Sequence, residues 1–217
     1  MVRRASLPAL MSAALRHASA IPVILNPAAR SARAADRVDR VRRLSPRVEI
    51  HATTGAGDAR RLARGLAEAG APVVVAAGGD GTVNEVISGL AEADAPGMPA
   101  LGILPLGTMN VLALEHRLPV LSLSQCWQRI ERGHVREIEL WTANGAVFAQ
   151  MAGVGLDAAV VRHTTWQAKK KWGPFSYMAT LVRLLDAPPL RVRVVTDAGE
   201  ELAGSAVLLG AGKFYGG

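Results

Sequence analysis

Cysteine is almost absent from this chain, because Cys126 is the only one in 217 residues. A single thiol excludes an intramolecular disulfide and a metal site built from several cysteines, and it is typical of a reducing compartment such as the cytoplasm. Aromatic residues are also few, at 4% of the chain, whereas hydrophobic residues make up 50%. We therefore expect a core of aliphatic side chains, as in α/β proteins.

The chain also lacks long apolar runs and an excess of acidic residues. No apolar run approaches the roughly 20 residues that a membrane-spanning helix requires. The net charge of +7 favours an anionic partner: a nucleotide, a nucleic acid or an anionic membrane surface. An arginine-rich coding bias would produce the same charge, so both explanations stay open.

The first twenty residues form a segment of their own. They faintly resemble a targeting peptide, but Pro8 and Arg16 interrupt the apolar stretch. We interpret residues 1–20 as a disordered extension and expect the protein in the cytoplasm.

From residue 21 the pattern alternates between strands and helices. Apolar runs predict strands over 21–25, 48–51, 73–77 and 101–104. Between them, the spacing of apolar residues predicts helices over 31–44, from Asp58 to Gly70, and after Gly81 with Val83, Val86, Ile87 and Leu90 facing inward. Strands that alternate with helices indicate βαβ units and a parallel sheet.

The character of the sequence changes after about Pro119. One helix over 125–131 precedes strand-like pieces over 135–141, 147–152, 190–196 and 206–210. Turns such as Asn144-Gly145 between them are typical of antiparallel structure. We therefore predict an α/β fold with two domains, one built on the parallel sheet over 21–119 and one built from antiparallel strands over 120–217.

A glycine-rich turn follows the third strand. Gly78 to Thr82 reads Gly-Gly-Asp-Gly-Thr at the start of a helix, where free backbone amides and the helix dipole favour phosphate. The turn is neither a Walker A loop nor a dinucleotide fingerprint. Asp80 would repel phosphate directly, so we expect magnesium between them. The alternative is that Asp80 or Thr82 simply caps the helix.

A second polar turn strengthens the functional interpretation. Leu106-Gly107-Thr108-Met109-Asn110 follows the fourth strand, Asn26-Pro27 follows the first, and Thr53-Thr54 follows the second. In open α/β sheets, ligands bind beyond the carboxyl ends of the strands. Four polar strand ends at one edge therefore predict a binding site there.

Three segments taken together resemble the diacylglycerol kinase catalytic-domain family, which includes bacterial lipid kinases and relatives of sphingosine and ceramide kinases. They are Asn26-Pro27, Gly79 to Val86, and Pro105 to Asn110. The Gly-Gly-Asp-Gly-Thr piece alone is shared with NAD kinases and phosphofructokinases. The resemblance implies ATP and Mg²⁺, with Asp80 as the catalytic and metal-organising residue. It also implies that residues 21–119 form a nucleotide-binding α/β domain and that residues 120–217 form an incomplete antiparallel β-sandwich. It implies an ATP site built from Asn26, Pro27, Ala28, Ala29, Arg30, Thr53, Gly79, Asp80, Gly81, Thr82, Val83, Asn84, Glu85, Gly107, Thr108 and Asn110.

The second half carries weaker parts of the same resemblance. Gly153 to Ala158 is similar to a Gly-x-Gly-x-Asp segment, which implies that Asp157 reaches the metal or the hinge. Lys169, Lys170, Lys171 and Trp172 resemble a basic and aromatic stretch of the family. Such a stretch suits the headgroups of an anionic bilayer, although a solvated loop would explain it equally.

Two departures from the family pattern affect the function. Val111 stands where many members carry an aspartate. The resemblance also implies that the general base lies in a segment that follows the family's Gly-Gly, with which this sequence ends at Gly217.

The sequence therefore leaves three hypotheses. The first is an ATP- and magnesium-dependent kinase that phosphorylates diacylglycerol or a similar lipid, peripheral at the inner membrane face, without nucleic acid and with a homodimer left open. The second is a nucleotide- or lipid-binding remnant without turnover. The third is an NAD-kinase-like enzyme.

Overall fold

The computed structural model describes residues 3–4, 18–27, 34–163, 179–180, 182 and 191–213. The chain divides into two compact units, residues 1–150 with 212–217 and residues 151–211. None of the helices in the described part of the chain is long and apolar enough to cross a membrane.

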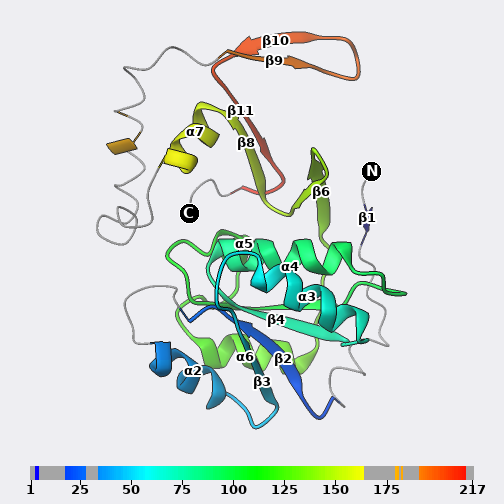
Figure 1. The fold of residues 1–217 in the computed structure, drawn as a ribbon, viewed down its shortest axis with the longest axis vertical. Coiled ribbons are helices and arrows are strands. Elements are labelled where there is room, and N and C mark those ends of the chain that lie inside the picture. The colour runs from blue at the N-terminus through cyan, green and yellow to red at the C-terminus, as the bar shows by residue number, and fades with distance from the viewer. Residues whose placement is uncertain are drawn as a thin grey trace. The chain divides into compact units, whose positions relative to one another are not determined.

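A four-stranded parallel sheet lies at the centre of the first unit (Figure 1). Its strands are β2 (Ile21–Leu25), β3 (Val48–Ala52), β4 (Val73–Gly78) and β5 (Ala100–Pro105). They are arranged in the order β3-β2-β4-β5, with Val23 level with both Ile50 and Val75. All six residues of β4 are buried, as expected for an inner strand covered on both faces. The predicted α/β fold and its parallel sheet are confirmed.

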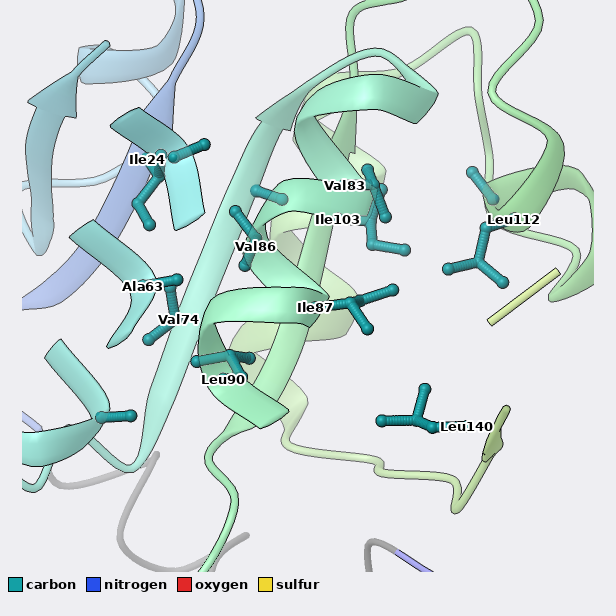
Figure 2. Close-up of a cluster of buried hydrophobic side chains, with 14 residues drawn as sticks. Ile24, Ala63, Val74, Val83, Val86, Ile87, Leu90, Ile103, Leu112 and Leu140 are labelled. Carbon is teal, nitrogen blue, oxygen red and sulfur yellow. The ribbon is translucent and has the colours of Figure 1, made fainter. Parts of the chain in front are cut away.

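Helices cover both faces of this sheet. The described part of the first unit contains α2 (Ala34–Arg42), α3 (Asp58–Glu68), α4 (Asp80–Glu92), α5 (Val111–Glu115) and α6 (Leu123–Arg132). Alternate residues of β4 point to opposite faces, so Val74 packs in one core cluster with α3 and α4, and Val75 in another with α2 and α6. Figure 2 shows α4 lying against β4, with Val83, Val86, Ile87 and Leu90 in the first cluster. The inward face predicted for α4 is therefore confirmed.

Helix α3 packs on α4 through its smallest side chains. Its fully buried residues are Ala59, Ala63 and Ala67, whereas Leu62 and Leu66, one turn apart in the sequence pattern, are only partly buried. The reason is the close approach of the two helices, because a Cβ added at Gly89 of α4 would collide with the carbonyl oxygen of Arg60.

The division between the units differs from the predicted domain boundary. The sequence predicts a boundary at 119–120, but the first unit continues to Gln150. The physical reason is α6, whose Cys126 and Trp127 are buried in the same cluster as β2 and β4.

Two short strands follow α6 in the first unit, β6 (Glu139–Ala143) and β7 (Ala146–Phe148). They form the hairpin predicted around Asn144-Gly145, and both turn residues have positive φ. The strand predicted from Val135 begins only at Glu139. Arg3–Arg4 forms a strand, β1, that pairs with β6, although the sequence predicts disorder there.

The second unit contains antiparallel pairs. β8 (Met151–Gly155) pairs with β11 (Ala206–Gly210), and β9 (Val192–Val195) pairs with β10 (Glu201–Gly204). A helix that the sequence did not predict, α7 (Leu156–His163), follows β8 directly. Gly155 has a φ of 83°, and a Cβ at this position would collide with the carbonyl oxygen of Ser205, so the chain turns into α7 at a position that requires glycine.

Candidate functional site

The order of the sheet reverses between β2 and β4, because the chain first adds β3 on one side and then β4 and β5 on the other. Ligands of open α/β sheets bind in the crevice at such a point, beyond the carboxyl ends of the strands. Asn26 follows β2 here, and its amide donates to the carbonyl of Ala77 on β4 at 3.0 Å. Asn26 and Pro27 are both half-buried. We call the loops at this end of β2, β4 and β5 the rim.

The first glycine turn leaves the start of α4 without a side-chain cap. Gly79 precedes the helix in extended conformation, and its carbonyl accepts the amide of Val83 at 3.0 Å. The amides of Asp80, Gly81 and Thr82 precede the first helical hydrogen bond and therefore lack a partner within α4. Unpaired amides and the positive end of the helix dipole together favour an anion at this position.

The two glycine turns lie directly against each other. The amide of Leu106 donates to the carbonyl of Gly78 at 2.8 Å. A Cβ added at Gly79 would lie 3.1 Å from the Cα of Gly107, and a Cβ added at Gly107 would collide with the Cα of Gly79. Gly107 is therefore required for the contact between the turns, and a side chain at position 79 would crowd it.

Asp80 connects these turns through its carboxylate. Its Oδ2 accepts the backbone amide of Asn110 at 3.0 Å, and its Oδ1 accepts the amide of Val111 at 2.6 Å. The carboxylate thus binds the amino end of α5 from the neighbouring strand. A carboxylate has about four acceptor positions, so each oxygen can accept one further bond. The sequence did not predict this contact.

Asn110 closes the second turn. It adopts a left-handed conformation with φ 53° and ψ 49°. Its Oδ1 accepts the amide of Gly107 at 2.9 Å, and its Nδ2 donates to the carbonyl of Gly107 at 3.1 Å. This predicted site residue therefore shapes the turn, while the adjacent Thr108 is exposed at its tip.

Two predicted threonines are buried under the rim. Thr82 is 6% exposed, and its Oγ1 accepts the Nδ2 of Asn26 at 3.4 Å, which links the loops after β2 and β4. Thr53 is 8% exposed, and its amide donates to the carbonyl of Leu25 at 2.9 Å. Both residues are buried beneath the rim, where their hydrogen bonds hold neighbouring strand ends in position.

Glu85 stabilises the start of α3. Its Oε2 accepts the amides of Gly57 and Ala59 at 3.1 and 3.2 Å, so a carboxylate from α4 caps the neighbouring helix. Asp58 accepts both the hydroxyl and the amide of Thr54, and these hydrogen bonds hold the pKa of its carboxyl well below the usual range. The loop after β3 is therefore held in place by two carboxylates.

The remaining predicted residues divide into three groups. Val83 is buried in the core cluster, whereas Gly81 and Asn84 are exposed at the start of α4. Asp157 lies in α7 of the second unit, and its side chain is outside the described part of the structure. The other predicted site residues lie outside the described part of the chain: Ala28, Ala29, Arg30, Lys169, Lys170, Lys171 and Trp172. Among the residues that are described, no group of three or more His, Cys, Asp or Glu side chains could hold a metal ion.

Comparison with known proteins agrees with the pattern of this rim. The model of the family "Diacylglycerol kinase catalytic domain" matches residues 20–143. The chain is 30% identical over 166 residues to the "Probable lipid kinase YegS-like" of Yersinia enterocolitica, and 31% identical over 170 residues to the "Probable lipid kinase YegS" of Escherichia fergusonii. These matches cover 76% of this chain and 56% of each relative, so the chain spans about half the length of these proteins.

Solved structures share the fold. A crystal structure of a diacylglycerol kinase from Bacillus anthracis superposes with a TM-score of 0.69 at 24% sequence identity. The superposition covers 91% of this chain and 68% of the other.

Proposed function

Because the chain belongs to the diacylglycerol kinase catalytic-domain family, we propose that it is an ATP- and magnesium-dependent kinase that phosphorylates a lipid hydroxyl, diacylglycerol being the first candidate. The observation that carries the proposal is the uncapped start of α4 beside the contact of two glycine turns. We assign nucleotide binding to the first unit, which carries the rim, and lipid binding to the second unit, residues 151–211.

The triphosphate is assigned to the rim by its charge and by the donors available there. The amides of Gly81 and Thr82 lie in the first turn of α4, where the helix dipole places about half a positive charge. Glycines at 79 and 107 let the backbones of the two turns approach each other closely. Phosphoryl transfer depends mainly on positioning and charge stabilisation, which this arrangement can supply.

Magnesium fits the rim only together with phosphate. Within the described residues, Asp80 is the one carboxylate that connects both turns, and its two oxygens already accept backbone amides. Mg²⁺ is commonly held by one or two carboxylates plus substrate phosphates and water, so one carboxylate is enough. When bound, the ion would neutralise charge on the transferred group. Asp80 would hold it, and would also fix the position of the second turn.

The location of the enzyme follows from its proposed substrate. Diacylglycerol is a membrane lipid, so we propose that the protein acts at the inner membrane face as a peripheral protein. The net charge of +7 supports this, because anionic lipids attract basic proteins. The basic stretch Lys169 to Lys171 is proposed as the membrane contact.

Radiolabelled ATP with diacylglycerol, sphingosine and NAD tests the proposal in one assay. We expect label in diacylglycerol, and no transfer by the Asp80→Ala variant. Asp94→Ala is the matched control, because Asp94 is exposed beyond the end of α4. Label in NADP would replace the proposal with the NAD-kinase hypothesis, and nucleotide binding without any product would support the remnant. Full transfer by Asp80→Ala would contradict the site assignment.

A further inference from the structure

A large cleft lies in the first unit, along β5. Its volume is about 1110 Å³, slightly above the usual range of about 300–1,000 Å³ for small-molecule sites. β5 is an outer strand of the sheet, and the cleft follows it from Ala100 to Ile103, away from the turn at Gly107. No residue of the two glycine turns lines it, so it is separate from the rim.

The lining of this cleft combines an apolar wall with an excess of positive charge. Ile87, Leu101 and Ile130 contribute to the apolar wall. The charged side chains that line it are five cations and one carboxylate: Arg117, Arg129, Arg132, Arg136, Lys213 and Glu115. Such a lining suits a ligand with an anionic head and an apolar tail.

Cationic residues gather around three consecutive residues at the end of α5, Glu115 to Arg117. The guanidinium of Arg129 donates to the carbonyl of Arg117 at 2.8 Å. His116 is close enough to Arg136 that this charge, together with the larger effect of burial, lowers the pKa of the imidazole. The amide of Lys213 donates to Glu115 at 2.8 Å. The cations of Arg129 and Arg136 thus lie beside residues 116–117, and the backbone of Lys213 contacts the neighbouring Glu115.

Among the described residues that line the cleft, Glu115 is the one carboxylate beside the five cations. Elsewhere in the first unit, Arg47, Arg60 and Arg64 each form an ion pair with a glutamate. Within the described residues, none of the five cations of the cleft forms an ion pair. The dipole of α6 favours Arg129 and Arg132 in its last turn, but it does not account for Arg136 or Lys213.

We propose that this cleft binds a lipid phosphate monoester, with the phosphate between Arg117, Arg129 and Arg136 and the acyl chain on the apolar wall. A phosphate monoester carries about −1.5 to −2 charges at neutral pH. A ligand with this charge matches several cations better than a ligand with one carboxylate, which carries a single charge. Arginine guanidinium groups also match phosphate oxygens in geometry. The site does not depend on the proposed kinase activity, although its ligand is of the same class as the proposed product.

Equilibrium dialysis of the full chain with radiolabelled lysophosphatidate, below its micelle concentration, tests the site. Lysophosphatidylcholine and inorganic phosphate are the comparison ligands. We expect saturable binding of lysophosphatidate, and binding at least about tenfold weaker for each comparison ligand and for the Arg136→Ala and Arg117→Ala variants. Arg42→Ala is the matched control, because Arg42 is an exposed arginine of α2.

The outcomes separate this proposal from the kinase proposal. Binding should persist at saturating ATP and Mg²⁺, which are proposed to occupy the rim; competition between ATP and lysophosphatidate would place the lipid at the rim and overturn the second site. Equal binding of inorganic phosphate or of lysophosphatidylcholine would also overturn it, as would unchanged binding by Arg136→Ala. An NMR titration gives a second readout, because a bound dianion should raise the pKa of His116 and inorganic phosphate at the same concentration should not.

Discussion

Replacing Asp80 by asparagine should separate its role in structure from its role in catalysis. The carboxylate accepts two amides, those of Asn110 and Val111, at 3.0 and 2.6 Å. Asparagine keeps one acceptor oxygen and turns its NH₂ group toward the second amide. A hydrogen bond to a charged group contributes about 1.5–3 kcal/mol, so we expect the free energy of unfolding to fall by about 2–3 kcal/mol. A domain of typical stability would remain folded after this loss.

Urea unfolding measures this loss directly. The midpoint should fall in Asp80→Asn while the slope with urea stays the same. The exposed Asp94→Asn should change the free energy of unfolding by less than about 0.5 kcal/mol. Asn110→Ala weakens the same turn, so the double variant should lose less than the sum of the two single losses. A wild-type midpoint for Asp80→Asn would refute the contact between the turns, whatever happened to activity.

Three further predictions follow from the same rim. Gly107→Ala should destabilise the chain by about 1–3 kcal/mol and weaken nucleotide binding, because its Cβ would collide with Gly79; unchanged urea unfolding and nucleotide affinity would contradict this. Glu85→Ala should lower the free energy of unfolding by about 1 kcal/mol, because the cap of α3 is lost. Glu92→Ala is the comparison: it removes only a surface ion pair with Arg60 and should change the free energy of unfolding less. Asp58→Asn should be less stable than wild type at pH 7 in urea unfolding, since the lowered pKa of Asp58 contributes stability above the unfolded value near 4. That difference should shrink as the pH falls below about 4; a constant difference down to the acid transition would contradict the role of Thr54 as partner.

The parallel sheet and both glycine turns could be predicted because their signals are local. Val73 to Ala77 is an uninterrupted apolar run that ends in glycines, and such a run forms a buried strand almost wherever it occurs in α/β proteins. The inward face of α4 follows from spacing alone. These features need no knowledge of distant partners.

The contacts made across the sequence could not be predicted in the same way. Asp80 binds amides 30 and 31 residues further on, and Glu85 caps a helix that begins 27 residues earlier, so neither role has a local signal. Helix α3 buries alanines in preference to leucines because of its close neighbour α4. That the rim residues bind ATP stays a prediction, because packing alone explains the positions of several of them.

A crystal structure with a non-hydrolysable ATP analogue and Mg²⁺ tests the rim most directly. We expect phosphate oxygens within hydrogen-bonding distance of the amides of Gly81 and Thr82, with the ion beside Asp80. A rim that stays empty at saturating nucleotide, or a triphosphate bound away from both glycine turns, would contradict the proposed kinase site.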